Sequence, residues 1–255
     1  MAFLYYDESI RERGGFIVAA LVISDVDLTQ KVNTAWLALG LNPATDEYKS
    51  SGVKVNNEVG QMQREVLRDL LGRSRLGLVI CSNDRRGYLG DGCAELIFQL
   101  VRTQMLAPTD HDVYLDQNIK MKPMLRERLQ SAGIKPFLNQ DSKLVSGLQV
   151  ADHAAHALGG MLLQKMGLTN KKIKAGEGSG YDPDTEIELG FELWAGLRYS
   201  LIGSNEKIDK SVPSDPTNPY FLVDGFGLHL DPQSPAELLA VSMDCFGVNY
   251  LGSIH

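Results

Sequence analysis

The chain contains short, continuous apolar runs and longer stretches in which apolar residues recur every three or four positions. Runs of the first kind are typical of buried strands, and stretches of the second kind are typical of amphipathic helices. The sequence predicts five strands and a mixed sheet in which the first strand is central and pairs antiparallel with the second and parallel with the fourth. The predicted strands cover residues 3–9, 16–23, 76–81, 112–117 and 134–138.

Helices are predicted between and after these strands, which gives an α/β fold with helices on the faces of the sheet. The first helix begins near Ser24 or Asp25, either of which has the side chain of a good N-cap. The last helix is long and rich in alanine, so that it can lie close to the sheet. The predicted helices cover residues 27–39, 57–72, 91–106, 123–132 and 146–166.

The pattern changes after residue 170, which divides the chain into a core (1–170, with a helical insertion at about 25–74) and a C-terminal appendage (171–255). Residues 171–180 are rich in lysine and glycine and read as a loop. Further on, the sequence predicts a helix at 186–201, a strand at 221–223 and a helix at 235–243. Exposing the appendage's aromatic side chains to water would be unfavourable, so we expect them to be mostly buried against the core or in a homodimer. They are Phe191, Trp194, Phe221 and Phe226.

Composition narrows the class of protein. With 44% hydrophobic and 22% charged residues, the chain can bury a core, and its apolar runs fall short of the ~20 residues of a membrane helix. Three distant cysteines and the lack of a secretory signal pattern favour a cytoplasmic protein and disfavour a disulfide framework or a thiolate zinc site.

The net charge of −7 disfavours nucleic-acid binding through overall charge, so any such contact requires a local basic patch. Basic residues follow the fourth strand and could contact phosphates, although their spacing also fits a solvated helix face. These residues are Lys120, Lys122, Arg126 and Arg128.

Carboxylates follow two of the predicted strands. Asp7 and Glu8 end the first strand, followed by Ser9, and Asp116 ends the fourth. Open α/β folds keep their chemistry at the carboxyl edge of the sheet, where these side chains would meet. The same residues also fit a solvated turn, and this alternative remains open.

The last helix carries a third acid. At 100° per residue, Gln149, Asp152 and His156 share one face of this helix, while alanine and leucine form the packing face. The acid would therefore lie near the surface or edge of the sheet. An exposed amphipathic helix with solvated polar groups is the alternative.

Four segments, at residues 6–9 (YDES), 47–49 (EYK), 114–116 (YLD) and 147–152 (GLQVAD), resemble the DUF3800 family, which is grouped with the ribonuclease H-like superfamily. The resemblance spans about residues 3–160. It implies a ribonuclease H-like mixed five-stranded sheet flanked by helices, with a helical insertion after the second strand. It further implies that Asp7, Asp116 and Asp152 hold divalent metal ions, with Glu8 as a fourth ligand and Lys49 as a phosphate contact.

The resemblance predicts a nuclease that hydrolyses phosphodiesters of DNA or RNA with Mg²⁺ or Mn²⁺. Two such ions ~4 Å apart can hold the attacking and leaving oxygens of the reaction. Gln149, His156 and Ser9 are candidates for supporting roles. Two other functions remain open: a non-catalytic binding module on the same fold, and a small-molecule phosphohydrolase, which fits the acidic surface better.

Overall fold

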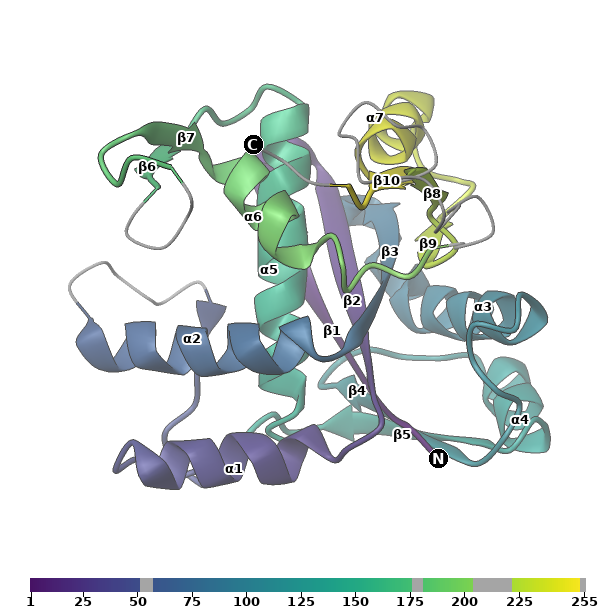
Figure 1. The fold of residues 1–255 in the computed structure, drawn as a ribbon. Helices are drawn as coiled ribbons and strands as arrows, with labels where there is room; N and C mark the ends of the chain where they lie inside the picture. Colours follow the sequence, from purple (N-terminus) through teal and green to yellow (C-terminus); the bar gives the residue numbers. More distant parts are fainter. Residues whose placement is uncertain (51–56, 176–180, 204–221, 253–255) are drawn as a thin grey trace, which may run out of the picture.

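A six-stranded mixed sheet organises the computed structural model, which describes residues 1–50, 57–175, 181–203 and 222–252 (Figure 1). The strand order is β5-β4-β1-β2-β3-β9. The bounds are β1 Phe3–Arg11, β2 Phe16–Ser24, β3 Arg75–Ser82, β4 His111–Asp116, β5 Ile134–Gln140 and β9 Leu228–Leu230. The predicted α/β class is confirmed, with β1 between antiparallel β2 and parallel β4 as expected. This sheet has six strands, one more than the five predicted.

Strands β1 and β2 form a hairpin at the centre of the sheet. The turn between them closes at Gly15, whose φ of 68° is readily adopted by glycine. All residues of β2 are buried, as its unbroken apolar run predicts for a strand covered on both faces. The parallel ladder aligns Tyr6 with Leu115, so the next residues along each strand, Asp7 and Asp116, reach the same edge.

Two helical layers cover the sheet. Helices α1 (Leu28–Ala38), α2 (Glu58–Gly72) and α5 (Leu148–Lys165) share one hydrophobic core with one face of the sheet, and α3 (Leu89–Arg102) and α4 (Pro123–Ser131) share another with the opposite face (Figure 1). A Cβ atom at Gly147 would lie 2.3 Å from the Tyr5 ring, which shows how closely the start of α5 approaches β1. In the described parts of the chain, no helix is both long and apolar enough to cross a membrane.

Two predicted helix ends need correction. Helix α1 is capped by Asp27 rather than by Ser24 or Asp25. The Asp27 side chain accepts a hydrogen bond from the backbone N of Thr29 at 2.9 Å. Helix α3 ends at Arg102, four residues earlier than predicted. The positive φ of 58° at Gln104 cannot continue a right-handed helix, which explains the early end.

The appendage contains more strand than predicted. Residues 172–174 form β6 (Lys172–Lys174) and pair with β7 (Glu186–Glu188), although a loop and a helix start were expected there (Figure 1). Strand β9 adds the sixth strand, parallel to β3. The remaining elements are α6 (Leu189–Leu197), β8 (Leu222–Asp224), α7 (Ala236–Phe246) and β10 (Val248–Tyr250), of which β8 and β10 form a separate antiparallel pair.

The described members of the predicted aromatic set in the appendage are mostly buried, as expected, but none is fully buried. Phe191, Trp194 and Phe226 are partly exposed, and Phe221 lies outside the described residues. Trp194 packs against the core that contains α5, whereas Phe226 packs against the core on the α3 side. The aromatic surface of the appendage is thus only partly covered within one chain.

Candidate metal centre

Three acids meet where β1 continues past the end of β4. Asp7, Glu8 and Asp116 each offer a carboxylate oxygen, and these atoms lie within 4.8 Å of one another. Among the residues the structure describes, this is the group of acids placed closely enough to share one metal ion. Asp7 is 7% exposed, and one of its oxygens accepts a hydrogen bond from the backbone N of Glu8 at 2.7 Å.

Glu8 has a buried carboxylate oxygen without a partner. Its side chain is 7% exposed, and Oε1 accepts a hydrogen bond from Arg86 Nη2 at 2.7 Å. Oε2 is buried and has no hydrogen-bond partner. A buried acceptor without a partner is costly, and a cation held between the three acids would satisfy it.

The acids also have shifted pKa values. Burial raises the pKa of Asp7 well above its usual range, and the charges of Asp116, Asp152 and Glu8 raise it further. Burial, together with the charge of Glu8, raises the pKa of Asp116 to about 6. Burial is the first cause for Asp152 as well, whose pKa is also raised. For all three acids burial is the largest cause of the upward pKa shift.

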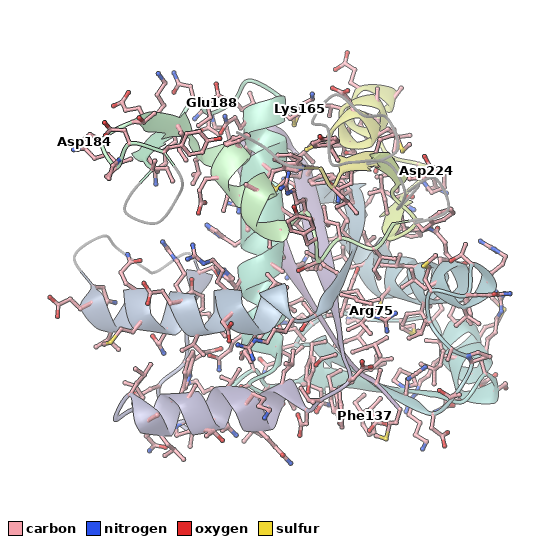
Figure 2. All side chains as sticks on the ribbon, viewed as in Figure 1. Arg75, Phe137, Lys165, Asp184, Glu188 and Asp224 are labelled. Atoms are coloured by element: carbon pink, nitrogen blue, oxygen red, sulfur yellow. The ribbon has the colours of Figure 1, made fainter. Side chains whose placement is uncertain are left out.

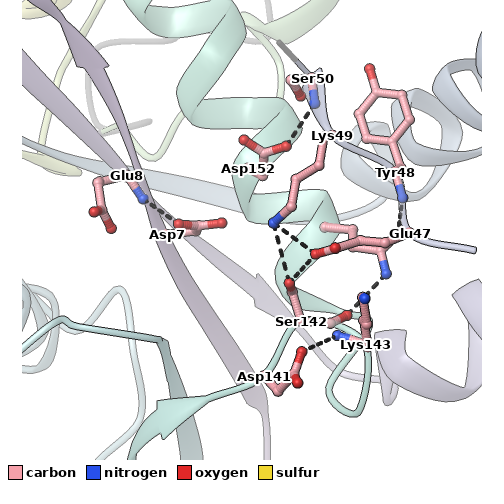
Figure 3. Close-up of polar contacts among 11 residues, drawn as sticks. Asp7, Glu8, Glu47, Tyr48, Lys49, Ser50, Asp141, Ser142, Lys143 and Asp152 are labelled. Atoms are coloured by element: carbon pink, nitrogen blue, oxygen red, sulfur yellow. Dashed lines mark hydrogen bonds and ion pairs between the residues drawn. The ribbon is translucent and has the colours of Figure 1, made fainter. Parts of the chain in front are cut away.

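Asp152 lies beside this group rather than within it. It is on the second turn of α5, and its Oδ2 accepts a hydrogen bond from the backbone N of Ser50 at 2.9 Å (Figure 3). Its charge still raises the pKa of Asp7. The group within reach of one shared ion therefore contains Asp7, Glu8 and Asp116, and Asp152 is outside it.

Residues 47–50 are fixed to the start of α5. The backbone N of Tyr48 donates to Gln149 Oε1 at 3.0 Å, and Gln149 Nε2 donates to the carbonyl of Ser142 at 2.9 Å (Figure 3). The Tyr48 hydroxyl lies 3.4 Å from His153 Nδ1. Gln149 is 1% exposed, and its contacts hold this segment in place.

The same segment brings a positive charge to the acids. Lys49 Nζ lies 2.7 Å from Glu47 Oε1, and Ser142 Oγ contacts both side chains. Burial lowers the pKa of Lys49, but Glu47, Asp152 and Asp7 more than offset this effect, so the net shift is upward and Lys49 is a cation. Sequence reasoning had not singled out Glu47 or Ser142, although Glu47 lies in the motif that contains Lys49.

The other predicted supporting residues lie outside the acid group. His156 is one turn beyond Asp152, and burial together with Arg11 lowers its pKa to about 4, so its side chain is neutral at pH 7. Arg11 donates to the backbone carbonyl of His156. Ser9 is two residues beyond Asp7 on the same face of β1 and is partly buried.

The basic residues after Asp116 do not all project freely into solvent. All four are exposed, but Lys122 forms an ion pair with Asp91 at 2.8 Å, and the Arg128 guanidinium lies 4.1 Å from the centre of the Phe98 ring. The cations that contact or influence the acids are instead Lys49, Arg86 and Arg11. They come from three separate segments, which is why no local cluster in the sequence indicated them.

We expect the raised pKa of Asp116 to make its replacement more stabilising as pH rises. The folded state holds the Asp116 proton more tightly than the unfolded chain, so the contribution of this group to stability falls as pH rises from about 4 to about 6. We therefore expect Asp116→Asn to become more stable relative to the unmodified protein as pH rises over this range. The free energies of unfolding of both proteins, measured in chelator, test this. A difference that does not change with pH would contradict the assignment.

Comparisons with known proteins do not place the chain in a family. No family model and no curated protein matches the sequence. Among solved structures, a chain of the PCNA:RNase HII complex from Archaeoglobus fulgidus is similar, with a TM-score of 0.40 and 15% identity over 72% of this chain and 84% of that chain. A similarity this distant carries no argument about activity.

Proposed function

We propose that the protein is a divalent-metal-dependent phosphodiester hydrolase that acts on DNA or RNA. The observation that carries this proposal is the close grouping of Asp7, Glu8 and Asp116, in which a buried oxygen of Glu8 has no partner. Carboxylate oxygens are the ligands that Mg²⁺ and Mn²⁺ prefer. When bound, such an ion would supply positive charge to a phosphate and lower the pKa of coordinated water.

The surrounding residues suit a phosphate substrate. Lys49, Arg86 and Arg11 provide positive charge around the acids, which would allow a chain of net charge −7 to receive a polyanion locally. Arg86 would also hold the Glu8 carboxylate in its buried position. This chemistry agrees with what the resemblance to the DUF3800 family and the ribonuclease H-like superfamily implies.

The group of acids does not line either of two cavities found in the molecule. One, of about 780 Å³, lies between α1 and α2, and one, of about 290 Å³, lies between α5 and α6. Neither is lined by Asp7, Glu8 or Asp116. The acids lie at an edge of the sheet, which suits an extended polymer better than an enclosed small molecule, so we favour nucleic acid over the small-molecule alternative.

An assay over several substrates tests the proposal. Single-stranded DNA, double-stranded DNA, RNA and a generic phosphodiester should be incubated with the full chain in Mg²⁺, in Mn²⁺ and in chelator. We expect cleavage of at least one polymer with either ion and none in chelator. Cleavage of the generic phosphodiester alone would favour a small-molecule enzyme, and binding of a polymer without cleavage would favour a binding module.

A further inference from the structure

The acids near the site form two groups with different partners. In the first group, Asp7, Glu8 and Asp116 face one another, and the oxygen without a partner belongs to Glu8. In the second, Asp152 accepts a hydrogen bond from the backbone N of Ser50, and Glu47 forms an ion pair with Lys49. Within the part of the chain that the structure describes, only the first group therefore has carboxylate oxygens close enough to share one ion.

Lys49 brings a cation to the second group. Figure 3 shows its side chain extending toward Glu47 and Ser142, and its Nζ lies 2.7 Å from Glu47 Oε1. The positive charge of Lys49 lowers the pKa of Asp116 and of Asp152, and the negative charges of Asp152 and Asp7 raise the pKa of Lys49. The Lys49 ammonium thus supplies positive charge near Asp152, the acid that a second metal ion would need.

The position of Lys49 is fixed on both sides of the residue. The backbone N of Tyr48 is bound by Gln149, and the backbone N of Ser50 is bound by Asp152. Tyr48 is 2% exposed, so its ring anchors the segment in the core. The Lys49 side chain is 56% exposed, which leaves it accessible to a substrate phosphate.

We propose that the centre takes one divalent ion, at Asp7, Glu8 and Asp116, and that the Lys49 ammonium occupies the place of a second ion. This inference rests on the proposed function and replaces the expectation of two ions. A second divalent ion beside Asp152 would lie near the positive charge of Lys49, and one of the two carboxylate oxygens of Asp152 already accepts a hydrogen bond from Ser50. Asp152 is then a positioning residue that holds the lysine segment, and Lys49 neutralises charge on the phosphate.

Metal titration of the full chain without substrate tests this assignment. After treatment with chelator, Mn²⁺ binding is measured by calorimetry at pH 7 for the unmodified protein, Lys49→Met and Lys49→Arg. We expect one ion per chain for the unmodified protein and for Lys49→Arg. Removing the positive charge in Lys49→Met should tighten Mn²⁺ binding about tenfold or admit a second ion, while cleavage falls.

Lys143→Met is the matched control, because Lys143 is an exposed lysine on the loop next to Ser142. It should bind Mn²⁺ as the unmodified protein does. Two ions per chain in the unmodified protein, or unchanged binding in Lys49→Met, would overturn the inference, and metal-dependent cleavage would then still support the proposed function. If no ion binds and no substrate is cleaved, both fail together. Melting curves in chelator establish that each variant is folded.

Discussion

Replacing Asp7 by Asn should remove metal-dependent cleavage while leaving the protein folded. Mutation of outer residues that only orient metal ligands commonly lowers metal affinity or activity 10–100-fold. Loss of a ligand itself should therefore lower the cleavage rate about 10³-fold or more. In chelator, the melting temperature of the variant should be higher than that of the unmodified protein. Asn removes a carboxylate whose pKa is raised by burial and by neighbouring charges, and so removes an unfavourable charge.

Metal should act differently on the two proteins. Mg²⁺ or Mn²⁺ should raise the melting temperature of the unmodified protein, since the ion binds the folded state, and should have little effect on Asp7→Asn. Asp112→Asn is the matched control: Asp112 is on β4 at the end far from the acids and pairs with Phe3. Normal cleavage by Asp7→Asn, or the same loss in Asp112→Asn, would show that the acid group is not the reaction centre.

Long elements could be predicted from the sequence because each one carries its own pattern. The run at residues 16–23 can be buried on both faces only inside a sheet, and the alanines of residues 146–166 allow close packing on it. The elements that were missed are three-residue strands such as β9 and β6. Three residues show no periodicity, and β9 exists because the backbone of β3 is available to pair with it.

The site was partly predictable for a similar reason. Asp7 and Asp116 end neighbouring parallel strands, so the fold brings them together. Glu8 was harder to place, because alternation along β1 directs it to the other face of the sheet. Strand β4 ends at Asp116 while β1 continues to Arg11, so the Glu8 carboxylate can reach the same edge.

Arg86 and Arg11 could not be predicted, because each depends on a contact between distant segments, and Lys49 was expected only through the family resemblance. Arg86 follows β3 and pairs with a residue of β1 that is 78 positions earlier. The hydrogen bonds that fix residues 47–50 to α5 join positions 101 and 102 residues apart. Such contacts depend on the packing of the fold and leave no local pattern in the sequence.

Replacing Asp231 by Ala should destabilise the whole fold, not only the appendage. Asp231 is fully buried after β9, and its Oδ2 accepts a hydrogen bond from Arg85 Nε at 2.8 Å. Breaking a buried pair commonly costs 3–5 kcal/mol; because the Arg85 side chain is 31% exposed and can be partly solvated, we expect about 2–4 kcal/mol. The free energy of unfolding in urea measures this loss.

The exposed pair of Lys174 and Asp184, at 2.6 Å in the appendage, provides the control (Figure 2). Asp184→Ala should change the free energy of unfolding by less than about 1 kcal/mol, as is usual for exposed pairs. Arg85 lies next to Arg86, which holds Glu8, so Asp231→Ala should also weaken Mn²⁺ binding. If Asp231→Ala is no more costly than Asp184→Ala, strand β9 is not part of the cooperative core, and the metal centre does not depend on it.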